Sequence, residues 1–216
     1  MLLVTGATGN IGRELVRELD ARGAAMRVLV RDLARAAALP PEGVERVVGD
    51  LDVPETLPGA FAGIDKVFLL TPGMGTETAA HAVAAARAAG VRHIVHVSSV
   101  NVLGDVGGVG GVGGGVLGDQ MPAMGRWHHA REKIIRASGL PVTFLRPGNF
   151  MTNTLAWAST IREENYVLDP VGPGRVASID PADIAAVAAL ILTGDGPGDH
   201  HGEAYVLTGD EPLTVT

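Results

Sequence analysis

The sequence predicts a doubly wound α/β fold, in which a parallel β-sheet is covered by helices on both faces. Short runs of Val, Leu and Ile recur along the chain, and most are followed by a turn and an alanine-rich helical segment. Strands that are apolar on both sides and alternate with helices are typical of parallel sheets. The chain has 216 residues, 46% of them hydrophobic, which suffices for a real core and excludes global disorder.

The expected strands are short apolar runs, each ended by a turn or a polar residue. They are Leu2–Thr5, Met26–Val30, Val44–Val48, Lys66–Leu70, His93–Val97, Val142–Leu145 and Glu203–Leu207. We expect Pro147 to stop the sixth strand, because proline cannot donate to a sheet ladder.

The expected helices lie between these strands. They cover Asn10–Arg22, Leu33–Leu39, Glu55–Phe61, Thr76–Ala89, Ala123–Ser138 and Asp180–Thr193. Apolar residues at helical spacing support the first: Ile11, Leu15, Val16 and Leu19. Pro40–Pro41 should end the second helix and Gly90 the fourth. Pro181 suits the first turn of the last helix, which Ser178 or Asp180 could cap.

Composition and charge exclude several classes of function. The net charge of −7 gives no electrostatic footprint for nucleic acid or for an anionic membrane. No cysteine is present, so a disulfide framework, a thiolate nucleophile and a cysteine-ligated metal site are excluded. The N-terminus lacks a basic segment, and the longest apolar stretch, Ile184–Leu192, is too short to cross a bilayer. We therefore expect a soluble, cytoplasmic protein.

Three glycines follow the first strand at a spacing that favours binding of a dinucleotide. In Val4-Thr5-Gly6-Ala7-Thr8-Gly9-Asn10-Ile11-Gly12 they stand between a strand and a helix. Such glycines allow a tight turn, room for a pyrophosphate and close packing of helix on strand. The N–H groups and the dipole at the helix start attract negative charge. We expect a Rossmann-type cofactor site that includes Gly6, Ala7, Thr8, Gly9, Asn10 and Ile11.

The Gly-x-x-Gly-x-x-Gly spacing resembles the short-chain dehydrogenase/reductase superfamily, and Thr-Gly-Ala-Thr-Gly-x-Ile-Gly resembles its atypical NmrA-like branch. The resemblance continues in order through residues 28–32, 49–51, 69–72, 97–99, 127–132, 138–141 and 145–150. It covers nearly the whole chain. It implies an NAD(P)-binding fold related to quinone and azo reductases.

The residue after the second strand points to the choice of cofactor. An acidic residue there would bind the ribose of NAD, whereas an arginine pairs with the 2′-phosphate of NADP. Arg31 stands first and Asp32 next, and Arg35 could add charge one turn later. We therefore expect NADP (NADPH) rather than NAD. The alternative is that Arg31 is a solvated loop residue and that Asp32 caps the following helix.

The resemblance implies roles for further residues. Asp50 and Leu51 would lie beside the adenine, and Thr71 and Pro72 would line the nicotinamide ribose. The segment that holds Pro147, Asn149 and Phe150 would approach the nicotinamide, and Ser98 is a further expected cofactor-binding residue. Asp50 could instead only make hydrogen bonds within its own loop, and Thr71–Pro72 could only mark the end of the fourth strand.

The superfamily's usual catalytic signature is missing. Its members carry Tyr-x-x-x-Lys on the helix after the fifth strand, and neither Tyr166 nor Tyr205 precedes a lysine by four residues. One alignment puts Met124 at the tyrosine and His128 at the lysine, and another offers His129-x-x-x-Lys133. His128 is the catalytic candidate, as a proton donor near neutral pH, with Ser98 or Ser99 as further polar groups. The alternative is that these histidines are ordinary surface residues.

Two functions are compatible with this pattern. We expect hydride transfer from NADPH to a hydrophobic, quinone-like or aromatic electrophile, because the charge that develops on such an acceptor is delocalised and water can supply the proton. The alternative is a non-catalytic NADP-binding redox sensor that resembles the NmrA regulators. No metal is expected, since His200 and His201 lie in a Gly/Pro-rich loop without helical register.

The alternation of strands and helices weakens beyond residue 149. Residues 1–149 should therefore form the dinucleotide-binding domain, and residues 150–216 a small, incomplete lobe that caps the substrate. Residues 211–216 resemble the start of a further helix of this lobe. A second subunit of a homo-oligomer could instead complete the substrate pocket. Gly104–Gly118, with nine glycines, is either a plain loop or a lid beside the fifth strand.

Overall fold

The computed structural model describes residues 1–40, 44–103, 123–167, 174–194 and 200–214. Seven parallel strands form one sheet in the order β3-β2-β1-β4-β5-β6-β7. The strands are β1 Leu2–Thr5, β2 Met26–Val30, β3 Val44–Val48, β4 Lys66–Leu69, β5 His93–Val97, β6 Val142–Pro147 and β7 Ala204–Leu207. This order and the all-parallel pairing confirm the predicted Rossmann-type fold. Gly104–Gly118 lies outside the described residues.

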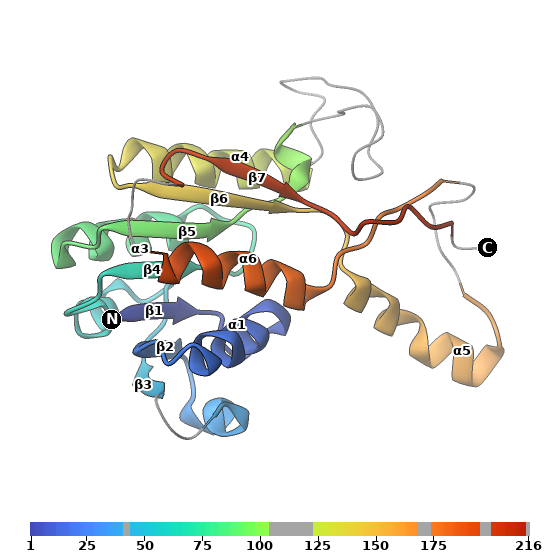
Figure 1. Cartoon of the computed structure of the whole chain (residues 1–216), viewed down its shortest axis with the longest axis horizontal. Helices are drawn as coiled ribbons and strands as arrows, with labels where there is room; N and C mark the ends of the chain where they lie inside the picture. Colours follow the sequence, from blue (N-terminus) through green and yellow to red (C-terminus); the bar gives the residue numbers. More distant parts are fainter. Residues whose placement is uncertain (41–43, 104–122, 168–173, 195–199, 215–216) are drawn as a thin grey trace.

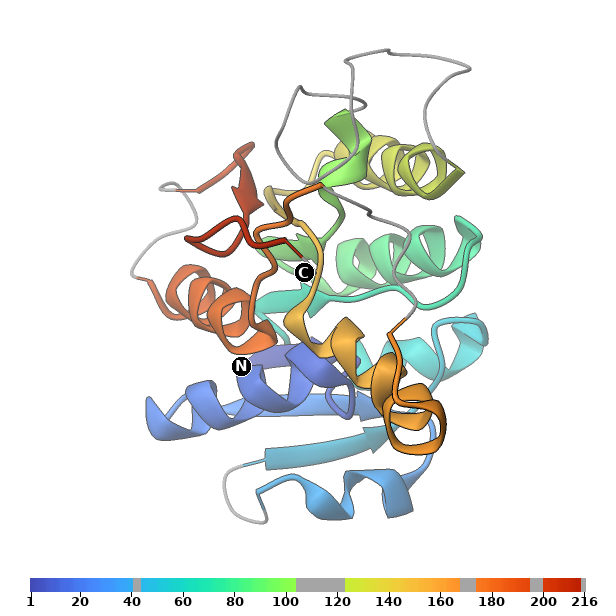
Figure 2. The same ribbon diagram turned by 90° about the vertical axis from the view of Figure 1, so that its right-hand side faces the viewer.

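Helices cover both faces of the sheet (Figures 1 and 2). They are α1 Asn10–Ala21, α2 Leu57–Phe61, α3 Glu77–Ala89, α4 Ala123–Ala137, α5 Ala158–Glu164 and α6 Pro181–Thr193. The 3₁₀ turns are η1 Leu33–Ala38, η2 Pro54–Thr56, η3 Val100–Leu103 and η4 Met151–Trp157. One apolar core lies under α1 and α6, and a second lies under α2, α3 and α4. Within the described residues, no helix is both long and apolar enough to cross a membrane.

The expected boundary at residue 150 does not separate two cores. Helix α6 packs on α1, with Ile184 and Leu192 buried in the same core as Leu15 of α1. Strand β7 pairs in parallel with β6, where Leu145 lies opposite Tyr205. These two elements therefore extend the sheet that β1–β6 form and do not make a lobe of their own. An apolar helix and a strand need a covered face, and the sheet provides it.

Among the described helices, α5 lies away from the sheet together with the η4 turn that precedes it (Figure 1). This segment follows β6 and lies beyond the carboxyl ends of the strands, and none of its residues is buried. Neither element was predicted from the sequence, because a helix without a buried face shows no apolar period. Strand β6 also continues through Pro147, which we expected to be its stop.

The order in which the chain adds strands to the sheet reverses between β1 and β4. The chain runs outward from β1 to β2 and β3, and then returns to β4 on the other side of β1. At such a point the loops after neighbouring strands diverge, and ligands of open α/β sheets bind at the carboxyl ends there. A ligand site is therefore expected among the residues that follow β1, β2 and β4.

A buried histidine makes the stability of the sheet sensitive to pH. His93 of β5 is fully buried, and its Nε2 lies 2.9 Å from Thr143 Oγ1 on β6. The Thr143 hydroxyl donates to the carbonyl oxygen of His200 at 2.7 Å, so Nε2 of His93 must carry the hydrogen of this bond. Burial, followed by the charge of Lys66, lowers the pKa of His93 to about 4 from 6.5.

We expect the free energy of unfolding to fall by about 2–3 kcal/mol through His93 alone between pH 7 and pH 4.5. In this window the unfolded histidine takes up a proton and the folded one does not, so acid favours unfolding. Urea titrations at the two pH values measure the change. His93→Gln keeps the donor but cannot be protonated, so its decrease should be smaller. Equal decreases for the two proteins would contradict this explanation.

Candidate cofactor site

A tight turn joins β1 to α1. Gly6 has a φ of +66°, a left-handed conformation that favours glycine, and the N–H of Gly9 donates to its carbonyl oxygen at 2.9 Å. Gly9 is the N-cap of α1; no described side chain caps this end, and the first turn holds no acidic residue. The N–H groups at the start of α1 are therefore available for an anion.

Gly12 lies where α1 crosses this turn. A Cβ atom at residue 12 would overlap the carbonyl oxygen of Gly6 and lie 2.7 Å from Cα of Ala7. A Cβ at Gly9 would meet the same carbonyl oxygen at 3.3 Å, which is tight but open to small adjustment. The spacing of the glycines does not distinguish them, whereas the structure shows that Gly12 has less room for a Cβ than Gly9.

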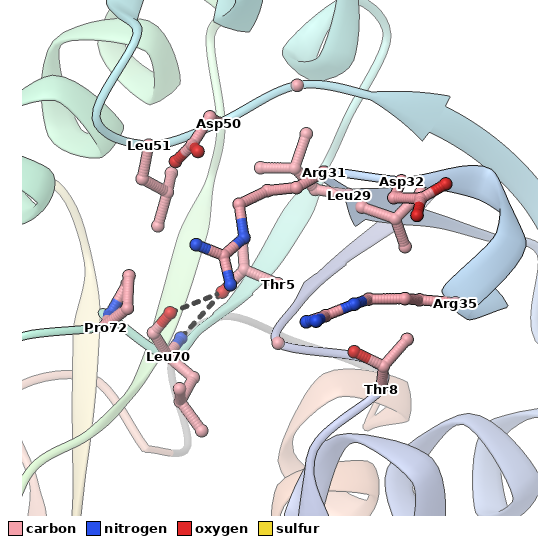
Figure 3. Close-up of a pocket in the computed structure, with 13 residues that line it drawn as sticks. Thr5, Thr8, Leu29, Arg31, Asp32, Arg35, Asp50, Leu51, Leu70 and Pro72 are labelled. Carbon is pink, nitrogen blue, oxygen red and sulfur yellow. Dashed lines mark hydrogen bonds between the residues drawn. The ribbon is translucent and has the colours of Figure 1, made fainter.

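A pocket opens beside this turn, at the carboxyl ends of β1, β2 and β4 (Figure 3). It is lined by Thr5, Gly6, Thr8, Leu29, Val30, Arg31, Asp32, Arg35, Gly49, Asp50, Leu51, Leu70 and Pro72. The hydroxyl of Thr5 accepts a hydrogen bond from the N–H of Leu70 at 2.7 Å and lies 3.0 Å from its carbonyl oxygen, which holds the ends of β1 and β4 together. The pocket therefore has a rigid floor.

Two arginines extend into this pocket from the β2 side. Figure 3 shows the guanidinium groups of Arg31 and Arg35 directed into the space that Thr8 and Leu70 border. Both side chains are exposed, and among the described residues neither has a carboxylate within 4.0 Å. Asp32 accepts a hydrogen bond from the N–H of Ala34 at 2.9 Å and caps η1. The site therefore presents two cations to an anionic group.

Some of the other predicted cofactor residues line the pocket, and others do not. Asp50, Leu51 and Pro72 line the pocket. Asp50 also accepts a hydrogen bond from the N–H of Asp52, so it caps its own loop as well. Thr71 is buried beneath the wall, and its Oγ1 has no partner among the described residues. Ala7 is buried in the apolar core.

The predicted residues after β6 lie outside the pocket. Pro147 is part of β6, and Phe150 packs against the core. Asn149 donates to Ser178 Oγ at 3.0 Å and accepts from Asn153 at 2.7 Å. These residues thus connect η4 to the sheet. Asn10 reaches the same segment, since its amide donates to Thr152 Oγ1 at 3.3 Å.

Ser98 is engaged in a buried ion-pair network. Its hydroxyl donates to Glu132 Oε1 at 2.7 Å, and Arg146 donates to both carboxylate oxygens of Glu132, at 2.9 and 2.7 Å. Burial raises the pKa of Glu132, but the bonds from Arg146 and Ser98 more than compensate and keep it lowered. Because the Ser98 hydrogen is held by a buried carboxylate, this hydroxyl connects α4 to β5 and is not directed at the pocket.

His128 has a different environment from the one expected. Its side chain is half-buried, Nδ1 has no partner among the described residues, and the Trp127 ring lies 5.4 Å away. Burial, and then the charge of Arg131, lowers the pKa of His128 to about 4. The imidazole is therefore neutral at pH 7. This disfavours the imidazolium acid that the sequence suggested, and no described residue supplies the missing tyrosine–lysine pair.

Sequence reasoning did not single out Arg131, which is 1% exposed. The signal was its position on α4, four residues after Trp127 and four before the buried Ile135. A charged residue on the apolar face of a helix indicates a buried polar contact.

The whole chain is similar to known reductases. The model of the NAD(P)H-binding family matches residues 6–195. The chain is 39% identical to NAD(P)H azoreductase of Xenophilus azovorans over 99% of this chain and 70% of that protein. It is 31% identical to quinone oxidoreductase 2 of Escherichia coli (strain K12), over 100% of this chain and 71% of the other.

A solved structure shows the same similarity in three dimensions. The triphenylmethane reductase of Citrobacter sp., complexed with NADP(H), superimposes with a TM-score of 0.81 at 28% identity. The superposition covers 99% of this chain and 72% of the reductase. Together with the glycine turn and the sheet order, these matches show that the chain belongs to the NAD(P)H-binding, NmrA-like branch of the atypical short-chain dehydrogenases/reductases.

Proposed function

We propose that the protein is an NADPH-dependent reductase that passes hydride to a hydrophobic, quinone-like or aromatic electrophile. The observation that carries the proposal is the pocket at the switch point, where two features meet. They are the turn before α1, whose Gly6 and Thr8 line the pocket, and the guanidinium groups of Arg31 and Arg35, which have no carboxylate of the described residues within 4.0 Å. A diphosphate would lie against the first, and the 2′-phosphate against Arg31 and Arg35. NADPH, when bound, supplies the hydride.

The residues fit this cofactor on steric grounds also. The positive φ of Gly6 and the close contact of Gly12 with the turn let the backbone at Gly6 reach the edge of the pocket without a side chain of its own. Such an approach is what a diphosphate requires. The similarity to an azoreductase and to a quinone oxidoreductase supports the reductase class.

The two groups expected as proton donors, Ser98 and His128, favour an acceptor that needs no proton donor from the protein. The Ser98 hydrogen is held by Glu132, and His128 is neutral near pH 7. A quinone or a similar electrophile can take hydride first, because the negative charge spreads over the acceptor. Exposed methionines follow two of the strands, Met74 after β4 and Met151 after β6, and a third, Met124, lies at the start of α4. They offer apolar surface to such an acceptor.

The test is the loss of NADPH absorbance in the near ultraviolet, with a naphthoquinone, an azo dye and a triphenylmethane dye as acceptors. We expect turnover with at least one of them and much slower turnover with NADH. Tight NADPH binding without turnover on any acceptor would favour the alternative, a redox sensor. A wild-type protein that binds neither dinucleotide would contradict both functions.

A further inference from the structure

One buried side chain, which does not line the pocket, makes hydrogen bonds to the loop after β4. Arg131 Nε donates to the carbonyl oxygen of Gly75 at 2.7 Å, and Nη2 donates to those of Pro72 and Gly73 at 3.0 and 2.7 Å. Nη1 lies 3.4 Å from the carbonyl oxygen of Thr71. Four of the five carbonyl groups of residues 71–75, the β4–α3 loop, thus converge on one guanidinium.

This contact is not an ion pair. Within the described part of the chain, no carboxylate lies within 4.0 Å of Arg131, and its nearest aromatic ring, that of Trp127, has its centroid 5.2 Å from Cζ. Burial lowers the pKa of Arg131, and the charge of Glu77 partly opposes this shift. A planar guanidinium has five N–H donors in a fixed fork, so it can hold several carbonyl groups in one arrangement. A lysine in the same place could not reproduce that geometry.

The β4–α3 loop borders the cofactor pocket on the side opposite the two exposed arginines. Pro72 of this loop lines the pocket, and Arg31 and Arg35 line it from β2 and η1. The strand order puts β1 between β2 and β4. A dinucleotide that spans the switch point has its adenosine half over the β2 side and its other half over the β4 side. The β4–α3 loop therefore supports the half that carries the reactive ring.

We propose that Arg131 is a positioning residue: it fixes the β4–α3 loop so that the nicotinamide half of the cofactor binds in one orientation. This inference rests on the proposed function, since it assumes that NADPH occupies the pocket. Arg131 does not face the pocket itself, and it acts through the carbonyl groups that it holds. Its loss should affect one half of the cofactor and leave the other half nearly unaffected.

The experiment compares two ligands on the same proteins. NADPH contacts both sides of the pocket, whereas 2′,5′-ADP is the adenosine half alone. In Arg131→Lys we expect the Kd for NADPH to rise about tenfold, as the loss of one or two hydrogen bonds implies, with the Kd for 2′,5′-ADP within about twofold of wild type. We also expect kcat to fall at saturating NADPH. Arg136→Lys, on an exposed residue of the same helix, is the matched control and should change neither Kd.

Gly73→Ala gives a second route if the Arg131 variant does not fold. Gly73 has a φ of +68°, and a Cβ there meets no atom within 4 Å, so the change strains the loop without a clash. It should show the same separation between the two ligands. Equal weakening of both ligands, or no change in either, would overturn the inference. If wild-type protein binds 2′,5′-ADP and NADPH but reduces no acceptor, the reductase proposal fails while the binding comparison still decides the role of Arg131.

Discussion

Gly12→Ala is expected to weaken NADPH binding by about a hundredfold or more, the equivalent of about 3 kcal/mol. The added Cβ would overlap the carbonyl oxygen of Gly6, and that atom belongs to backbone and not to a flexible side chain. Helix α1 must then move away from the turn, which separates the N–H groups at its start from the glycine turn. Because both elements would bind the same diphosphate under the proposed function, the loss should apply equally to NADPH and NADH. Calorimetry with each dinucleotide measures it.

Gly59→Ala is the matched control. Gly59 lies in α2, and a Cβ there meets nothing within 4 Å. Alanine is favoured over glycine in a helix by about 1 kcal/mol, so this variant should be as stable as wild type or slightly more so, with unchanged NADPH binding. Near-native affinity in Gly12→Ala, with a native circular dichroism spectrum, would show that α1 does not need this close packing to bind the diphosphate.

The double variant Arg31→Ala/Arg35→Ala is expected to lose about a hundredfold in affinity for NADPH, while NADH binding changes by less than about threefold. Each guanidinium can make a charge-assisted hydrogen bond to the 2′-phosphate, worth about 1.5–3 kcal/mol, and NADH lacks that group. No described carboxylate pairs with these arginines, so their removal leaves no unpaired acid. The ratio of kcat/KM for the two cofactors, or of their Kd values, measures the change.

Arg92→Ala serves as the control for overall charge. Arg92 is exposed, pairs with Asp65 at 3.0 Å and does not line the pocket. Its removal should leave the ratio between NADPH and NADH unchanged. Wild-type affinity for NADPH should also decrease with added salt more steeply than that of the double variant. If both cofactors weaken equally in the double variant, the arginines shape the pocket and do not recognise the 2′-phosphate.

Local sequence patterns were sufficient to predict much of the fold. Apolar runs such as Met26–Val30 and periodic helices such as α1 depend on residues that are neighbours in the chain, so their bounds differ from the structure by only one or two residues. The glycine turn is equally local, because its shape follows from the φ of Gly6 and from the lack of a Cβ at Gly6, Gly9 and Gly12. The position of α6 and β7 was not predicted, since their partners are distant in sequence.

The amino-acid sequence by itself was enough to predict the parallel sheet, the glycine turn before α1 and the position of an arginine after β2. Each of these features depends on a short stretch of consecutive residues. Only the tertiary structure decided what the isolated polar residues do. It places Ser98 against Glu132, gives His128 a lowered pKa and buries Arg131 behind the β4–α3 loop. The physical reason is that hydrogen bonding and desolvation depend on which atoms meet across the fold, and spacing along one chain does not specify those atoms.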